Sequence, residues 1–196
     1  MTLQTYLETP RLRLREWCDA DIEPWSLLNA DPRVMQFFPN TYDRARSETS
    51  AAVMRERLEA DGYGLWAVEV KGGPKFVGMI GLQIVPAEMP FAPAMEVGWR
   101  LAVEVWGRGF ATEGARAALG FGFERLGRKE IVALTAAANL RSQRVMQKLA
   151  MSHDEAENFE HPGLQPSHPL CNHVLYRLGR ERFLTDGRNA QSYTIR

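Results

Sequence analysis

Gly107, Gly109 and Thr112 lie in the stretch "VEVWGRGFATEG" (103–114), where an apolar strand pattern gives way to an alanine-rich helical pattern. Glycines at such a junction permit left-handed backbone angles and the close approach of a ligand. The backbone N–H groups of the first helical turn then point at one place, and the helix dipole favours an anion there. The stretch predicts either a phosphate-binding turn or a plain tight turn capped by Thr112.

Two common phosphate-binding motifs do not fit this turn. Gly109 and Gly114 have the glycine spacing of a P-loop, but Ala115 and Arg116 follow where the motif needs Lys and then Ser or Thr. The dinucleotide-binding motif needs a third glycine where Thr112 stands. The phosphate-binding interpretation that remains is a short pyrophosphate-binding arm made of successive backbone N–H groups, with the plain tight turn as the alternative.

The elements that would position this turn follow from hydrophobic periodicity and from glycine and proline breaks. Period-2 alternation and short apolar runs predict strands at 11–17, 64–70, 75–85, 95–103, 130–136 and 173–183. Helical spacing predicts a helix, a turn and a short second helix within 19–39, and further helices at 43–60, 111–126 and 140–150.

The order of these elements predicts how the strands pair. The runs 64–70 and 75–85 are joined by a glycine turn, which favours an antiparallel hairpin. A helix separates 95–103 from 130–136, which favours a right-handed crossover and a parallel pair. The chain is expected to form one domain over 1–183, followed by a loose tail at 184–196.

Charge and composition exclude several classes of partner. Lys and Arg total 24, as do Asp and Glu, so the formal net charge is zero and a nucleic-acid partner is not expected. The chain contains neither a signal-like start nor an apolar run long enough to span a bilayer, which predicts no membrane partner and a cytoplasmic location.

The cysteines and histidines do not indicate a metal site or a disulfide. Cys18 and Cys171 match no metal-ligand spacing, and two cysteines in a chain of 196 residues favour a reducing compartment. No two histidines have the helical i, i+4 spacing of a zinc site; the four are His153, His161, His168 and His173. We therefore expect no metal.

Two longer stretches identify a family resemblance. "EVGWRLAVEVWGRGFATEGARAALGFGFERLG" (96–127) and "NLRSQRVMQKLAM" (139–151) resemble the GNAT superfamily of acyl-CoA-dependent N-acyltransferases, and in particular its RimJ/RimL-type branch. The resemblance implies an α/β (α+β) GNAT fold with a mixed, mostly antiparallel twisted sheet flanked by helices. Its fourth and fifth strands would run parallel and splay apart, and acetyl-CoA would be the cosubstrate.

The resemblance also assigns residues to the cosubstrate. The edge formed by Leu101, Ala102 and Val103 would pair with the pantetheine arm. The turn would hold the pyrophosphate through Gly107, Arg108, Gly109, Phe110, Ala111 and Thr112. Asn139 and Ser142 would contact the pantetheine arm, although plain helix capping suits both residue types. Three cations, Arg141, Arg144 and Lys148, would either meet the ribose phosphate or remain solvated helix charges.

For catalysis the resemblance implies direct attack of a neutral amine on the thioester. A backbone N–H near Arg100 or Leu101 would stabilise the oxyanion. Glu96 stands where many relatives have a carboxylate facing the acceptor, and would take the amine proton directly or through water. The alternative is that Glu96 is a structural ion-pair or edge residue.

The sequence departs from the wider superfamily at the position of its usual acid. Met146 stands where many members have a tyrosine that protonates the leaving thiolate, and Met cannot donate a proton. Tyr176 is the substitute candidate, with a plain core residue as the alternative. Ala150 and Met151 replace the usual Gly-Phe, which is expected to alter packing at a strand start.

The acceptor is the least defined part of this interpretation. By resemblance, 31–42 and 161–170 would form its walls, and four aromatic residues would either line it or form core: Trp25, Phe37, Phe38 and Tyr42. The acceptor would be a protein N-terminus or a small-molecule amine, and the protein a monomer or homodimer. The competing hypotheses are a non-catalytic acyl-CoA-binding or regulatory module and a nucleotide-dependent enzyme that uses the same turn.

Overall fold

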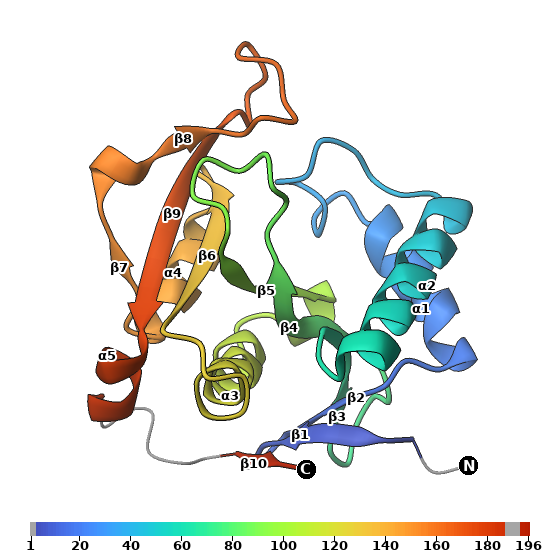
Figure 1. Ribbon diagram of the computed structural model, residues 1–196. Helices are drawn as coiled ribbons and strands as arrows, with labels where there is room; N and C mark the ends of the chain where they lie inside the picture. Colours follow the sequence, from blue (N-terminus) through green and yellow to red (C-terminus); the bar gives the residue numbers. More distant parts are fainter. Residues whose placement is uncertain (1–2, 187–192) are drawn as a thin grey trace.

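The structure is a computed structural model and describes residues 3–186 and 193–196. In these residues ten strands form one sheet in the order β10-β1-β2-β3-β4-β5-β6-β9-β7, with β8 also paired to β9 (Figure 1). The strands are β1 Thr5–Glu8, β2 Leu12–Arg15, β3 Leu65–Val70, β4 Gly78–Ile84, β5 Met95–Leu101, β6 Glu130–Ala136, β7 Ser152–His153, β8 Phe159–Glu160, β9 Asn172–Gly179 and β10 Thr194–Ile195.

All described strand pairs are antiparallel except β5 and β6, which are parallel. The mixed, mostly antiparallel sheet expected from the sequence is therefore confirmed. The strand β1 is not among the expected strands, so the splayed pair is the fifth and sixth strand of the chain and not the fourth and fifth. Four residues give too short a pattern for periodicity to register.

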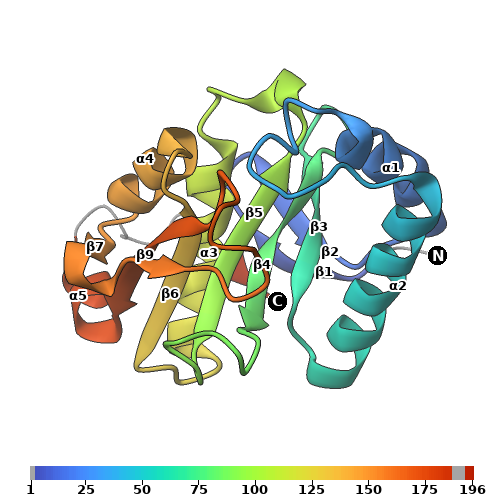
Figure 2. The same ribbon diagram turned by 90° about the horizontal axis from the view of Figure 1, so that it is seen from above.

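Five helices cover the sheet in the described part of the chain: α1 Ile22–Ala30, α2 Arg44–Asp61, α3 Phe110–Glu124, α4 Leu140–Lys148 and α5 Arg180–Thr185. In Figure 2, β5 lies near the centre, α1 and α2 lie to its right, and α4 and α5 lie to its left. The helix α3 packs on the opposite face of the sheet from α1 and α2. Residues on alternate positions of β4 and β5 thus face different helices.

The helix α3 lies close to the sheet because two of its positions have no side chain. A Cβ atom on Gly114 would stand 2.5 Å from the side chain of Ile80, and one on Gly122 would stand 2.5 Å from that of Ile131. Because Cβ contacts that short are essentially never seen, these glycines leave room for the terminal methyl groups of the two isoleucines against α3. The helix α3 packed in this way forms the crossover connection between the parallel strands β5 and β6.

The expected short second helix before residue 39 is wrong. Residues 32–40 form turns, beginning with hydrogen bonds from the N–H groups of Val34 and Met35 to the carbonyl of Asp31. Val34 and Met35 are still buried, 8% and 3% exposed. The turn buries the same apolar residues that a helix would bury, so the sequence pattern does not distinguish the two structures.

The expected loose tail at 184–196 falls partly on residues 187–192, which lie outside the described residues. On either side of them the chain has structure that the sequence pattern did not predict. The helix α5 continues to Thr185, and β10 pairs with β1 through Leu7 opposite Ile195 and Glu8 opposite Thr194. A single domain over residues 1–183 remains our interpretation of the chain.

Ala150 occupies a backbone conformation that normally selects glycine. Its φ is 62°, and the N–H groups of Ala150 and Met151 donate to the carbonyls of Gln147 and Met146, which is the Schellman ending of α4. The left-handed conformation costs a residue with a Cβ about 1 kcal/mol. Ala150 is 4% exposed, so replacement by Gly also removes one buried methyl group, which offsets part of the relief of strain.

We therefore expect Ala150→Gly to stabilise the protein by about 0.5–1 kcal/mol and to raise its melting temperature by roughly 2 °C. Thermal unfolding followed by circular dichroism measures this. Ala115→Gly in the middle of α3 is the matched control, and there the same change should destabilise. A lower melting temperature for Ala150→Gly would contradict the assignment of strain.

Candidate active site

A gap opens between the parallel strands β5 and β6. The two strands share one bridge, Glu96 opposite Val132, and then separate. On the other edge of β5, the N–H of Ala102 donates to the carbonyl of Val77, and the carbonyl of Ala94 accepts from the N–H of Val85. The main-chain groups of the even-numbered residues of β5 therefore point to β4. The main-chain groups of the odd-numbered residues, including the N–H groups of Trp99 and Leu101, therefore face the gap.

Two residues assigned to this edge do not lie on it. The strand β5 ends at Leu101, and Val103–Val105 form a 3₁₀ turn that leads the chain back towards α3. The N–H of Ala102 is bonded to Val77, and neither Ala102 nor Val103 lines the cavity. The prediction that Ala102 and Val103 form part of the pantetheine-binding edge is therefore wrong. The apolar alternation of the strand continues into the turn, so the sequence pattern does not show where the strand ends.

A cavity of about 680 Å³ occupies the gap and extends over the face of the sheet that carries α1 and α2. It brings together most of the site residues that the sequence analysis named. Those lining it are Glu96, Leu101, Gly107, Gly109, Phe110, Ala111, Thr112, Asn139 and Ser142. The side chain of Arg108 instead lies over the ring of Phe110, 5.0 Å from its centre, and does not line the cavity.

The glycine turn has the geometry of an anion-binding site. Gly107 and Gly109 have φ values of 74° and 82°, and no protein atom lies within 3.4 Å of a Cβ built at either. Among the described residues, no acceptor is bonded to the N–H groups of 107–112. Open space over unbonded N–H groups at a helix start fits a pyrophosphate, so these residues fit the expected cosubstrate.

A side-chain network holds this turn against the start of the chain. Glu113, in the first turn of α3, accepts from the Thr9 hydroxyl at 2.6 Å and from the Arg11 Nε at 2.6 Å. Arg11 also donates through Nη1 to the carbonyl of Arg108 at 2.9 Å. The Glu of the "ATEG" motif therefore positions the turn and does not face the ligand, a role that sequence spacing does not reveal.

The start of α4 forms the opposite side of the gap. Asn139 caps α4 by accepting from the Ser142 N–H at 3.2 Å, and it donates to the hydroxyls of Ser142 and Thr135. The capping alternative is thus realised, while both residues also line the cavity. Arg141 lies over the ring of Trp106 at 4.2 Å, which connects α4 to the glycine turn. Arg141, Arg144 and Lys148 all line this end of the cavity.

Glu96 lies on β5 inside the cavity, beside one polar partner. Gln83 of β4, directly opposite in the sheet, donates from Nε2 to Glu96 Oε2 at 2.9 Å. Burial raises the pKa of Glu96 to about 7, and the hydrogen bond from Gln83 opposes part of that shift. No ion pair to Glu96 occurs among the described residues, so the structural ion-pair alternative is not realised. The side chain is set to exchange a proton near neutral pH.

The structure does not bring Tyr176 to the cavity. Tyr176 is 3% exposed, stacks on His153 with ring centres 4.9 Å apart, and shares its hydroxyl with Gln143 and Gln147 of α4. The core alternative is the one realised, because Tyr176 lies on the face of β9 opposite that of the acceptor side. Met146 does line the cavity and is 1% exposed.

The two loops that the resemblance assigned to the acceptor both line the cavity at the end away from the glycine turn, which we call its acceptor side. Phe37 and Phe38 line one wall, whereas Trp25 is buried in the core. The loop 161–170 and the start of β9 form the other wall through His161, Gly163, Leu164, Leu170 and His173. Burial lowers the pKa of both His161 and His173, which leaves their imidazoles neutral at pH 7.

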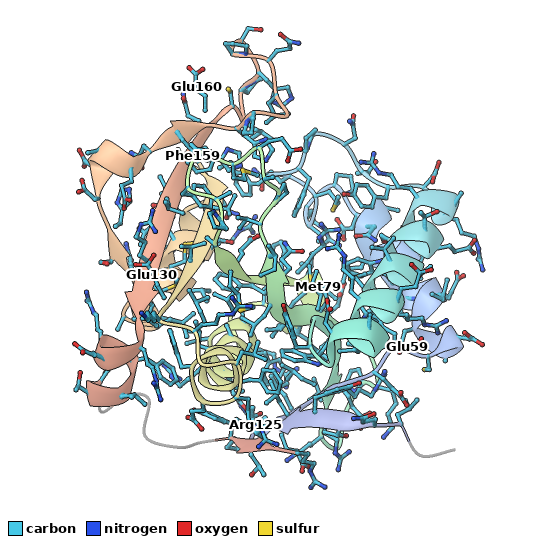
Figure 3. The ribbon with its side chains drawn as sticks, in the orientation of Figure 1. Glu59, Met79, Arg125, Glu130, Phe159 and Glu160 are labelled. Carbon is cyan, nitrogen blue, oxygen red and sulfur yellow. The ribbon has the colours of Figure 1, made fainter. Side chains whose placement is uncertain are left out.

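A small apolar cluster supports this second wall. Phe159, labelled in Figure 3, lies 5.2 Å from Phe91 and 5.6 Å from His173 between ring centres. Sequence reasoning considered His173 only as a metal ligand and missed Gln83 altogether. Gln83 gives a usable signal, since it is a polar residue near the end of an otherwise apolar strand.

Comparison with known proteins identifies the family of this chain. The family described as "Acetyltransferase (GNAT) domain" matches residues 11–152. The chain belongs to this GNAT acetyltransferase family, and the GNAT fold expected from the sequence is confirmed. The chain is thus an acetyltransferase of the kind that uses acetyl-CoA.

Two relatives are similar to this chain over most of its length. It is 33% identical over 156 residues to the Bacillus subtilis protein YkkB, covering 79% of this chain and 90% of that one. It is 31% identical over 193 residues to the Aspergillus fumigatus FsC-acetyl coenzyme A-N(2)-transacetylase, covering 92% and 79%.

Solved structures show the same fold at lower identity. A GNAT-family acetyltransferase from Bacillus anthracis has a TM-score of 0.75 at 21% identity and covers 90% of this chain and 99% of that one. The ribosomal L7/L12 alpha-N-protein acetyltransferase RimL has a TM-score of 0.72 at 12% identity, with 91% and 96% covered. At that identity RimL supports the fold alone, so membership of the RimJ/RimL-type branch stays a prediction.

Two further observations concern only the described residues. Within 3–186 and 193–196, no three His, Cys, Asp or Glu side chains lie together as a group that could hold a metal ion. None of the helices in that part of the chain is long and apolar enough to cross a membrane.

Proposed function

We propose that this protein transfers the acetyl group of acetyl-CoA to a primary amine by direct attack. The observation that carries the proposal is Glu96, which has a pKa near 7 and lies in the cavity beside the open edge of β5. A neutral amine is the nucleophile, and most amines are protonated at pH 7. A carboxylate that titrates near neutrality is suited to remove that proton, directly or through one water.

The backbone of β5 supplies the second part of the mechanism. When the amine nitrogen bonds to the thioester carbonyl, negative charge develops on the carbonyl oxygen. The N–H of Leu101 faces the gap and is our candidate donor, whereas that of Arg100 points to Met79 on β4. With Met146 in place of a tyrosine, we infer that the thiolate leaves unprotonated or takes a proton from water. The unbonded N–H groups of 107–112 would hold the pyrophosphate meanwhile.

The acceptor we favour is a small-molecule amine. One relative with a chemically specific name, the Aspergillus fumigatus enzyme, is named for N(2)-acetylation of FsC. A protein N-terminus, as the name of RimL describes for that protein, is the second candidate. The cytoplasm is the location we propose, because Cys18 and Cys171 are both free, which fits a reducing compartment.

Release of free thiol from acetyl-CoA, measured with a panel of primary amines, tests this function. We expect amine-dependent release with at least one acceptor class, and mass spectrometry should find the acceptor 42 Da heavier, which is the mass of an added acetyl group. Tight CoA binding without turnover for any acceptor would favour the non-catalytic module. Thermal stabilisation by NAD or ATP but not by CoA would favour a nucleotide-dependent enzyme.

The glycine turn provides a separate test of donor binding. In Gly109→Ala, an alanine would have to adopt the left-handed conformation at a φ of 82°, which costs about 1–2 kcal/mol. The turn relieves that strain by shifting its N–H groups, so we expect CoA to bind about tenfold more weakly by calorimetry. Gly127→Ala is the matched control, because its φ is 63° but it does not line the cavity. Equal CoA affinity for both variants would show that the turn does not bind CoA.

A further inference from the structure

Arg100 is a cation in the acceptor side of the cavity that lacks a carboxylate partner. Its Nη1 donates to Asn29 Oδ1 at 2.6 Å, and its guanidinium lies over the ring of Phe38 at 4.1 Å. The rings of Trp25 and Tyr42 lie 5.2 and 5.4 Å away. Its Nε is buried without a hydrogen-bond acceptor. Among the described residues, no Asp or Glu forms an ion pair with Arg100.

A second arginine on this side of the molecule, Arg15, is 2% exposed and has a carboxylate partner, although its Nε also lacks a hydrogen-bond acceptor. Arg15 makes two hydrogen bonds to Asp21, at 2.7 and 2.8 Å, and donates to the carbonyl of Lys75. A guanidinium keeps its charge in proteins, and a buried charge is normally paired. Burial accordingly lowers the pKa of Arg100, and the Tyr42 hydroxyl beside it opposes only part of that shift, with no carboxylate contributing. Arg100 lines the cavity, and no carboxylate among the described residues neutralises its charge.

Arg100 and Glu96 stand on the same face of β5. Side chains alternate along a strand, so Glu96, Gly98 and Arg100 share the face that carries α1 and α2. At Gly98 a Cβ would meet one atom within 4 Å, Glu96 Oε1 at 3.8 Å, so the floor between the two charged residues is open. Met79, which pairs with Arg100 on β4 and is labelled near the centre of Figure 3, lies beside this floor.

The remaining cations that line the cavity do not compete for this position. Arg33 is held by Asp31 through hydrogen bonds of 2.6–3.1 Å. The others lie on α4 at the donor end, namely Arg141, Arg144 and Lys148. An anion bound on the acceptor side beside Glu96 would thus meet Arg100 first.

We propose that Arg100 binds a carboxylate of the acceptor, so that the acceptor is an amino-carboxylate compound of the amino-acid class. Its amine would lie towards Glu96 and its carboxylate against the guanidinium, with Gly98 leaving room between them. A planar guanidinium presents its N–H donors in a fork that matches a carboxylate, and the aromatic rings fix its orientation. This inference rests on the proposed acetyl transfer and names the substrate class of the same site.

Matched acceptor pairs test the proposal. The probes are glycine, L-alanine, L-phenylalanine and 4-aminobutanoate, each compared with its own amide, in which the carboxylate is neutral and the amine is kept. We expect the wild-type protein to have a KM at least tenfold lower for the better acids than for their amides. In Arg100→Gln the KM for the acid should rise at least tenfold, while the KM for the amide and the kcat for both should change less than threefold.

Arg46→Gln is the control for general loss of positive charge. Arg46 is exposed on α2 and lies 4.0 Å over the same Tyr42 ring, but it does not line the cavity. It should keep the wild-type preference for acids. Arg100→Lys retains the charge without the planar fork, and an intermediate preference is expected from it should the Gln variant fail to fold.

A binding measurement makes the outcome independent of turnover. N-acetyl-L-phenylalanine and its amide are both product-like, and in the presence of CoA only the acid should raise the melting temperature of the wild-type protein. Acetylation of acids and amides with equal KM would overturn the role of Arg100 and leave the proposed function intact. Failure to acetylate any amine, by contrast, would overturn the proposed function and this assignment with it.

Discussion

Replacing Glu96 by Gln is expected to lower kcat/KM for the acceptor by about 10²- to 10⁴-fold. The amide keeps the size of the side chain and can still bond to Gln83, which donates to Glu96 at 2.9 Å. It cannot accept the proton of the attacking amine. Steady-state thiol release measures the effect. Glu130→Gln is the control, since Glu130 is exposed, pairs with Arg177 and does not line the cavity.

The pH profile separates a proton acceptor from a residue that only shapes the cavity. Because the pKa of Glu96 is raised to about 7, wild-type kcat/KM should rise about tenfold per pH unit below pH 7 and flatten above it. The variant should lose this inflection, while its CoA affinity stays within twofold of wild type. An unchanged profile in Glu96→Gln would remove Glu96 from the mechanism.

Stability measurements report on the same carboxyl group without any substrate. The pKa of Glu96 is raised on folding, so the folded state holds the proton more tightly, and stability falls as pH rises from about 4.5 to about 7. Gln does not carry this cost. We expect Glu96→Gln to be more stable than wild type at pH 8, by up to about 3 kcal/mol, and nearly equal to it at pH 4.5. Thermal melts at the two pH values measure the difference, and equal differences would contradict a raised pKa.

Asp21→Ala is expected to destabilise the protein by about 3–5 kcal/mol. Asp21 and Arg15 are each 2% exposed, and two hydrogen bonds of 2.7 and 2.8 Å join them. Asp21 Oδ2 also accepts from the N–H of Cys18 at 2.8 Å. Removal of the carboxylate takes away the bidentate partner of a buried guanidinium, which keeps only two carbonyls and Glu69 at 3.5 Å, and leaves the Cys18 N–H without its acceptor. Urea unfolding should show the loss as a lower midpoint with an unchanged slope.

Asp19→Ala is the matched control for this effect. Asp19 also forms an ion pair, to Arg55 at 2.8 Å, but its side chain is 98% exposed. Exposed pairs contribute about 0–1 kcal/mol, so the midpoint should hardly move. A similar loss in both variants would mean that burial does not set the strength of the Arg15–Asp21 pair.

The glycine turn shows how far local sequence reaches. Left-handed backbone at Gly107 and Gly109 and a helix starting at Phe110 follow from residue types within one short stretch. Parallel pairing of the flanking strands follows from the connection length. These features depend on neighbours in the chain, which is why they were predictable.

The short elements show where local reasoning stops. Neither β1 nor β10 has a pattern long enough to detect, and each forms because the other strand supplies hydrogen bonds. The end of β5 at Leu101 is set by the turn that brings Trp106 back, where the Trp106 indole donates to the Leu101 carbonyl at 2.8 Å. Alternation alone extended that strand through Ala102 and Val103.

The site divides in the same way. Residue types and spacing along the chain were enough to predict a glycine turn at a helix start and the crossover between the parallel strands, and the family resemblance added the pyrophosphate role of that turn and a carboxylate at Glu96. Which groups are left without partners depended on the packing of distant segments. Among the described residues, Gln83 is the hydrogen-bond partner of Glu96, Tyr176 is turned away towards α4, and Arg100 lies among rings from α1 and the following turns without a carboxylate partner. The burial of a group and the pairing of its charge depend on residues that are distant in the sequence, so both are set only when the chain has folded.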